Sequence, residues 1–122
     1  MARILVIDDD ELIRITLHTI LQRAGYEVTL ATNGQDGLKK FRERPADLVI
    51  LDIIMPEKGG IEVLGEFRRD APEVKIIAIS GGVMRSETDY LAAPKELGAD
   101  HCLAKPFRPR DLLEAVARFL PR

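Results

Sequence analysis

The sequence predicts an α/β fold in which one parallel β-sheet is covered by helices on both faces. Two observations carry this prediction. Apolar runs of four to six residues alternate five times with longer segments in which apolar residues recur at helical spacing. Short apolar runs between helix-like segments are typical of the buried strands of a parallel sheet. Five such βα units with right-handed crossovers give a doubly wound, three-layer sandwich.

The elements are predicted in strict alternation. The five strands are expected at Ile4–Ile7, Val28–Ala31, Leu48–Leu51, Val74–Ile79 and His101–Ala104. The helices are expected at Glu11–Ala24, from Thr32 or Asn33 to about Arg44, at Gly60–Arg69, and from Pro109 to the end of the chain. This order matches the flavodoxin-like arrangement, whose strand order is 2-1-3-4-5.

Caps and breakers define the first two helices. Asp10 is interpreted as the N-cap of the first helix, and Gly25 is a typical C-terminal stop. The second helix is expected to end before Pro45, because proline cannot continue a helix. The apolar positions of the first helix are expected in the core: Leu12, Ile13, Leu17, Ile20 and Leu21.

The later elements are bounded by proline and glycine. Pro56, Gly59 and Gly60 predict the loop after the third strand, and Pro72 follows the third helix. Between residues 81 and 98, Ser86 and Asp89 resemble a capping box, but Pro94 lies inside the expected helix. Proline there costs ~3 kcal/mol, so a short, kinked or broken helix is expected. Pro109 suits the first turn of the final helix, whose apolar positions are Leu112, Leu113, Val116 and Leu120.

Length and composition limit the functional classes. The 122 residues suit one domain, with 46% apolar and 31% charged residues and a net charge of −2. A direct nucleic-acid contact is not expected without a basic face. No apolar run is long enough for a membrane span, and no signal peptide fits. The single cysteine, Cys102, favours a reducing, cytoplasmic setting. We expect one domain over residues 1–122 and no output domain.

Acidic residues follow two of the predicted strands. Asp8 and Asp9 come directly after the first strand, and Asp52 after the third. In the flavodoxin-like order these strands are neighbours, so the three carboxylates are expected to converge. Two carboxylates ~4 Å apart repel by roughly 4 kcal/mol at an effective dielectric constant near 20. Oxygen ligands of this kind suit Mg²⁺, and Lys105, after the fifth strand, supplies a second positive charge.

Other residues at the same edge complete a site for a phosphoryl group. Ser80 ends the fourth strand and offers a hydroxyl donor, and Gly81 leaves space beside it. A carboxylate can act as a nucleophile toward phosphorus and form an aspartyl phosphate. Pro106 favours a fixed loop after Lys105. The Lys105–Pro106 peptide bond could be cis, because proline lowers the penalty for the cis form to ~0.5–1 kcal/mol.

Four motifs carry a resemblance that covers essentially the whole chain. They are VIDDD at 6–10, LVILDIIMP at 48–56, IIAISG at 76–81 and LAKPF at 103–107. Together, in this order and spacing, they resemble the receiver domains of two-component response regulators, which are chemotaxis-type receiver folds when they stand alone. The resemblance implies that Asp52 accepts phosphate from a sensor histidine kinase or histidine phosphotransfer protein. It implies a site for Mg²⁺ or Mn²⁺ formed by Asp8, Asp9, Asp52 and the carbonyl of Ile54, with Ser80 and Lys105 contacting the phosphoryl group. Such a domain catalyses only its own phosphorylation and dephosphorylation.

The chain also departs from the family pattern. Cys102 stands three positions before the lysine, where the family usually has an aromatic residue that swings inward on activation. Gly59 and Gly60 stand where the family loop usually reads Asp-Gly. The stretch from Ser80 to Lys105 is a few residues longer than usual. These departures affect the output mechanism more than the phosphoryl chemistry.

Alternatives remain open at this stage. The acidic residues could be helix caps, Lys105 a solvated loop lysine and Ser80 a simple turn residue. The same fold could be a phosphorylation-independent protein-binding scaffold or a small flavin or nucleotide binder. The last is disfavoured because the sequence has no glycine-rich phosphate loop. The sequence names neither the kinase nor the downstream protein target, and a phosphorylation-dependent homodimer stays open.

Overall fold

The computed structural model describes residues 1–53, 60–80 and 98–120. In this part of the chain, five parallel strands form one sheet in the order β2-β1-β3-β4-β5. The strands are β1 (Arg3–Ile7), β2 (Glu27–Ala31), β3 (Leu48–Asp52), β4 (Lys75–Ser80) and β5 (His101–Ala104). The helices are α1 (Glu11–Arg23), α2 (Gly34–Glu43), α3 (Gly60–Asp70) and α5 (Pro109–Phe119). The predicted doubly wound sheet and its strand order are confirmed.

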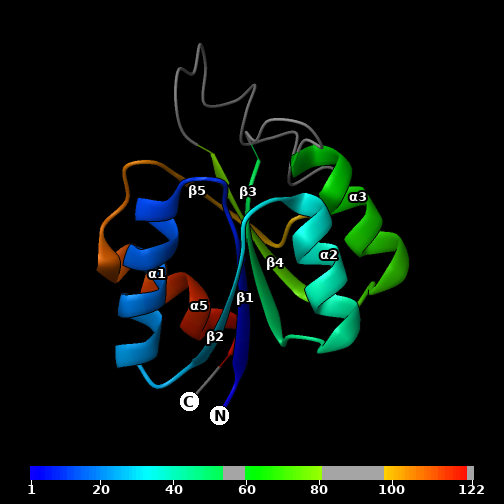
Figure 1. The fold of residues 1–122 in the computed structure, drawn as a ribbon. Helices are drawn as coiled ribbons and strands as arrows, with labels where there is room; N and C mark the ends of the chain where they lie inside the picture. The colour runs from blue at the N-terminus through cyan, green and yellow to red at the C-terminus, as the bar shows by residue number, and fades with distance from the viewer. Residues whose placement is uncertain (54–59, 81–97, 121–122) are drawn as a thin grey trace.

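The helices form a layer on each face of the sheet. Figure 1 shows α1 and α5 on one face and α2 and α3 on the other. Each face has its own apolar core: Leu17, Leu21 and Val116 pack on the first, and Leu38, Leu64 and Phe67 on the second. Strand β3, in the centre, is buried along its whole length. The continuous apolar run in the sequence therefore reflects burial on both faces.

Three of the predicted helix boundaries lie where the sequence places them. The Asp10 carboxylate accepts hydrogen bonds from the backbone N–H groups of Leu12 and Ile13, and so caps α1. Asn33, rather than Thr32, caps α2, accepting from the N–H of Asp36 at 2.8 Å. Gly25 follows α1 with a φ of 98°, a conformation that favours glycine.

The structure corrects the expected core face of α1. Leu17 and Leu21 are buried, but Leu12 is 70% exposed. At about 100° per residue, Leu12 lies about 140° around the helix from Leu17 and about 180° from Leu21, so it is on the opposite side of α1. Leu12 therefore does not share the core face of the helix with Leu17 and Leu21, and its prediction as a core residue was wrong. Ile15, which was not predicted in the core, is also exposed, at 52%.

At the amino ends of β4 and β5, Arg68 of α3 holds the segments that lead into these two strands. Its guanidinium donates to the carbonyls of Gly98 and Val74, both at 2.6 Å, and pairs with the carboxylate of Asp100. Asp100 in turn accepts the backbone N–H of Ile76 at 2.8 Å. One arginine thus satisfies main-chain groups where the chain enters β5.

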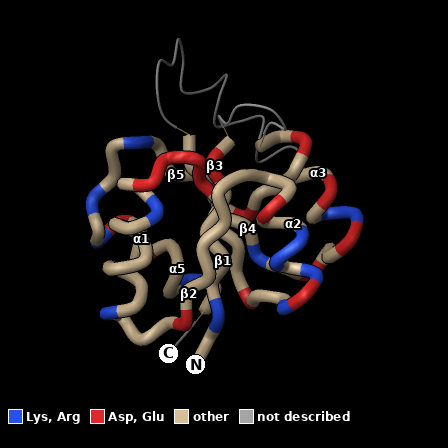
Figure 2. The backbone as a smooth tube through the Cα atoms, viewed as in Figure 1, with Lys and Arg blue, Asp and Glu red and all other residues tan. Residues whose placement is uncertain are grey.

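The expected helix between residues 81 and 98, including Ser86, Asp89 and Pro94, lies outside the described residues. Among the helices that are described, none has the length and apolar character to cross a membrane. Basic and acidic residues are mixed on the outer faces of α2 and α3, whereas acidic residues gather at the turn after β1 (Figure 2). That turn is the starting point for the functional site.

Candidate functional site

The candidate site lies at the carboxyl edge of the sheet, where the strands end. Asp8 follows β1, Asp52 is the last residue of β3, Ser80 is the last residue of β4, and Lys105 follows β5. All strands are parallel, so their carboxyl ends lie at one edge of the sheet (Figure 1), and these four residues, far apart in the chain, belong to that edge. This is the edge at which doubly wound sheets bind their ligands.

Three carboxylates converge there. One oxygen from each of Asp8, Asp9 and Asp52 lies within 4.8 Å of the others. Asp8 and Asp52 are buried, with 1% and 4% of their surface exposed, while Asp9 is exposed to solvent. Burial of like charges this close together is unfavourable unless a cation compensates them.

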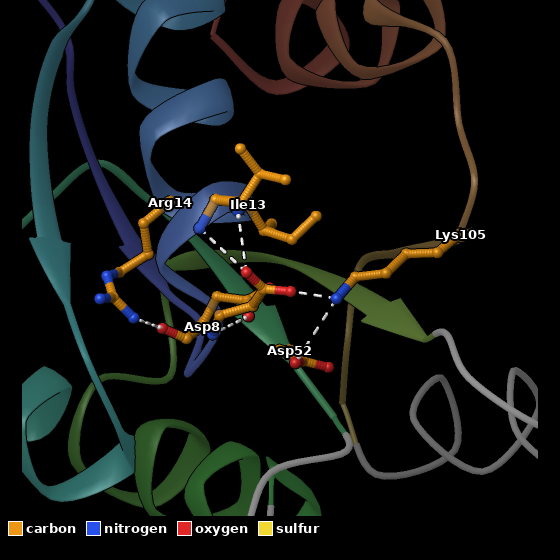
Figure 3. A network of polar contacts seen from close by, with 7 residues as sticks. Asp8, Ile13, Arg14, Asp52 and Lys105 are labelled. Atoms are coloured by element: carbon orange, nitrogen blue, oxygen red, sulfur yellow. Dashed lines mark hydrogen bonds and ion pairs between the residues drawn. The ribbon is translucent and has the colours of Figure 1, made fainter.

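Lys105 supplies part of that compensation. Its ammonium nitrogen Nζ lies 3.3 Å from Oδ2 of Asp8 and 3.6 Å from Oδ2 of Asp52. Figure 3 shows the lysine side chain reaching between the two carboxylates. Lys105 is therefore not a solvated loop lysine. Three carboxylates and one ammonium still leave an excess of two negative charges, which is the charge of one divalent cation.

The donor set fits Mg²⁺. The cluster offers only carboxylate oxygens, the ligands this ion prefers, and the exposed side at Asp9 leaves room for the waters that Mg²⁺ retains. No sulfur or imidazole ligand belongs to the cluster among the described residues. The predicted carbonyl ligand of Ile54 and the space beside Ser80 assigned to Gly81 lie outside those residues.

Asp8 is held from several sides. Its backbone N–H donates to the carbonyl of Ala31 at 3.2 Å, and its Oδ1 accepts the N–H of Asp10 at 2.9 Å. Its own carbonyl accepts a hydrogen bond from Nη1 of Arg14 at 2.7 Å. The sequence reasoning missed Arg14. The only available signal was its position one helical turn after the cap of α1.

The end of β4 is tied to the loop after β5. The backbone N–H of Lys105 donates to the carbonyl of Ser80 at 2.8 Å, and the Lys105–Pro106 peptide bond is cis. Ser80 is fully buried. Cys102 is half-buried on β5, opposite Ala78 of β4, and packs against the core on the α2–α3 side.

Gly60 is required by close packing beside Asp52. Its N–H donates to the carbonyl of Ile53 at 3.0 Å, and a methyl group in its place would collide with the main chain of Asp52 and Ile53. Of the two glycines Gly59 and Gly60, Gly60 thus lets α3 start directly against the acidic site. Gly59 lies outside the described residues.

A doubly wound sheet with buried aspartates and a lysine at its carboxyl edge defines a class of α/β domains with an acidic ligand site at that edge. Comparison with known proteins identifies the family. The sequence profile of the response regulator receiver domain matches residues 4–117. The chain belongs to this family and is a receiver domain of two-component systems.

Named relatives agree with this assignment. The chain is 38% identical over 115 residues to the chemotaxis protein CheY of Thermotoga maritima, covering 93% of each chain. It is 36% identical to the alkaline phosphatase synthesis transcriptional regulatory protein PhoP of Bacillus subtilis, covering 98% of this chain and 49% of that relative. The chain thus spans nearly the full length of one relative and about half of another.

Solved structures share the fold. A response regulator receiver domain protein from Clostridium thermocellum superposes with a TM-score of 0.89 at 31% identity, covering 98% of this chain and 94% of the other. The chemotaxis protein CheY4 of Vibrio cholerae superposes with a TM-score of 0.86 at 32% identity, covering 98% of both chains. The fold is therefore that of the CheY-like receivers.

Proposed function

We propose that Asp52 is the phosphoacceptor of a two-component phosphorelay. The observation that carries the proposal is the placement of its carboxylate, buried at the end of β3 with one oxygen 3.6 Å from the Lys105 ammonium. Asp8 and Asp9 lie beside it as the proposed metal ligands. Asp52 is the acid of the cluster that is itself the last residue of a central strand, β3.

The proposed reaction is an in-line transfer from a phosphohistidine. A carboxylate oxygen of Asp52 attacks phosphorus, the P–N bond breaks, and the imidazole leaves with the electron pair and is protonated by solvent. The Lys105 ammonium stabilises the negative charge on the transferring oxygens, because its Nζ already lies between the two carboxylates of Asp8 and Asp52. Asp8, Asp9, Asp52 and the carbonyl of Ile54 would hold Mg²⁺ or Mn²⁺, which would supply further positive charge.

The phosphoryl group is proposed to shift an equilibrium between two conformations. Ser80, with Gly81 next to it, would donate its hydroxyl to a phosphoryl oxygen, and the loop would move with it. The hydrogen bond from the backbone N–H of Lys105 to the carbonyl of Ser80 links the end of β4 to the loop after β5. Cys102 replaces the usual aromatic residue, so the change in the fourth-helix region would proceed without an aromatic rotamer on β5.

The proposed phosphodonor is a protein, a histidine kinase or a histidine phosphotransfer protein. An apolar groove of about 450 Å³ lies between α1 and the loop after β5, lined in part by Ile13, Ile20 and Phe107, and Lys105 borders it. The exposed side chains of Leu12 and Ile15 lie on the same helix. An apolar surface beside the acceptor suits a docking helix.

Acetyl phosphate tests the phosphoacceptor role without a protein donor. With Mg²⁺, the wild-type chain should gain the mass of one phosphoryl group, and Asp52→Asn should not. Asp10→Asn is the matched control, because asparagine caps a helix as well as aspartate does and Asp10 lies outside the carboxylate cluster. Detection of a phosphoryl group on the Asp52→Asn variant would disprove the assignment.

The phosphorylation-independent scaffold is the second outcome of this test. If the wild type binds no Mg²⁺ in a titration followed by amide spectra and gains no phosphoryl group, the chain acts by binding partners alone. The cluster of Asp8, Asp9 and Asp52 favours phosphorylation, since a scaffold has no need to bury like charges.

A further inference from the structure

We propose that Arg14 is a positioning residue for the acidic site. Its guanidinium holds the main-chain carbonyl of Asp8 and thereby fixes the turn from which Asp8 and Asp9 reach a divalent cation. The inference rests on the proposed metal role of these two residues. It assigns to a side chain outside the carboxylate cluster a share of the metal affinity.

The hydrogen bond from Arg14 to the carbonyl of Asp8 lies just past the point where β1 stops pairing with β2. The pairing of β1 with β2 ends at Ile7 and Ala31. One bond continues beyond it, from the N–H of Asp8 to the carbonyl of Ala31 at 3.2 Å. The chain then leaves β2 for α2, so β2 offers no partner for the carbonyl of Asp8. Arg14 Nη1 takes this place at 2.7 Å.

Arg14 and Lys105 act on different parts of Asp8. Figure 3 shows them reaching it from opposite sides, Arg14 at the main chain and Lys105 at the carboxylate. With the N–H of Asp10 on Oδ1, every polar group of Asp8 has a partner. Asp9, next in the chain, is exposed, and its direction depends on the same turn. Fixing the carbonyl of Asp8 therefore orients both acids.

A positioning role and a purely electrostatic role predict opposite signs. If Arg14 mattered only through its charge, its removal would strengthen binding of a cation, because a nearby positive charge repels it. If it positions the turn, its removal weakens binding. Groups that orient metal ligands typically contribute about 10- to 100-fold to affinity, and the low end applies to a contact with the main chain.

The experiment measures the Mg²⁺ dissociation constant of the unphosphorylated protein from amide chemical shifts. Arg14→Met keeps the length of the stem but removes the charge and the donor, and we expect about tenfold weaker binding. Arg14→Lys keeps a cationic donor and should remain within about threefold of the wild type. Arg23→Met removes an exposed charge from the last turn of α1 and should leave the affinity unchanged.

The thermal midpoint in EDTA establishes that each variant is folded. If Arg14→Met is not folded, Arg14→Gln replaces it, because its amide is too short to reach the carbonyl of Asp8. Unchanged or tighter Mg²⁺ binding without Arg14 would overturn the proposal, and so would equal weakening in Arg14→Lys. Phosphorylation of the wild type by acetyl phosphate is scored separately. Its failure would refute the proposed function and leave the metal result intact.

Discussion

Replacing Lys105 with methionine tests the electrostatics of the site directly. Methionine keeps most of the length of the side chain and removes the ammonium. In the structure this ammonium lies 3.3 Å from Asp8 and 3.6 Å from Asp52, and both acids are almost fully buried. The variant therefore leaves three neighbouring carboxylates without their cation.

The size of the effect follows from these distances. At an effective dielectric constant near 20, each of the two attractions amounts to ~5 kcal/mol before desolvation is subtracted. Removing one partner of a fully buried pair costs about 3–5 kcal/mol, and an exposed pair is worth about 0–1 kcal/mol. The Lys105 side chain is 22% exposed. We therefore expect the free energy of unfolding to fall by ~2–3 kcal/mol in metal-free buffer, between these limits.

The assay is thermal unfolding with EDTA and with saturating Mg²⁺. Each kcal/mol shifts the midpoint of a domain of this size by about 3–5 °C, so Lys105→Met should lose about 6–15 °C in EDTA. Mg²⁺ should restore most of this loss, because the variant offers the ion a site with one fewer competing positive charge. Lys39→Met, at an exposed position of α2, is the control and should change neither value.

The interaction between variant and metal is the decisive result. A loss of stability equal in EDTA and in Mg²⁺ would show that Lys105 stabilises the fold by packing rather than by charge compensation. Weaker Mg²⁺ binding in the variant would refute the argument outright, since a tethered ammonium between two metal ligands must compete with the ion.

Two further outcomes are expected. Ile15→Asp should slow phosphotransfer about tenfold when the donor is a histidine kinase that phosphorylates the wild type, and should leave phosphorylation by acetyl phosphate unchanged. Gln22→Asp, farther along α1, is the control and should change neither rate. Equal slowing with both donors would contradict docking at α1. Hydrogen bonds from Arg42 and Arg69 lower the pKa of Asp70. The folded state therefore holds fewer protons, so this contribution is present above about pH 4 and is lost as pH falls further. Urea unfolding of the wild type and Asp70→Asn below about pH 5 should show a shallower loss in the variant, and identical slopes would argue against it.

The fold could be predicted because its signals are local. Each strand of the sheet is an apolar run, and the caps at Asp10 and Asn33 and the stop at Gly25 are encoded within a few residues of the ends they mark. The convergence of Asp8 and Asp52 followed from topology, since parallel neighbours end at the same edge. Their roles as metal ligand and phosphoacceptor stay predictions.

The two features that the sequence analysis missed, the exposure of Leu12 and the contact of Arg14, have different causes. Leu12 is apolar, but it lies on the side of α1 opposite Leu21, where its side chain is exposed. Arg14 reaches back six residues to a carbonyl that lacks a partner on β2 only because that strand ends at Ala31. The end of a neighbouring strand has no signature in the residues that it leaves without a partner.

Charge balance links the site to its proposed switch. Two of the three carboxylates, Asp8 and Asp9, keep their charge when Asp52 is phosphorylated, and the phosphoryl group brings ~1.5–2 negative charges in place of one. Lys105 and a divalent cation together offset three, so the modified site carries about 0.5–1 negative charge more than its cations balance. Dipolar donors must supply the remainder, and Ser80, buried at the end of β4 and bonded through its carbonyl to Lys105, ends the strand next to β3. In the proposed function its hydroxyl turns to a phosphoryl oxygen as the chain after β4 moves, so the excess charge on Asp52 would itself drive the conformational change.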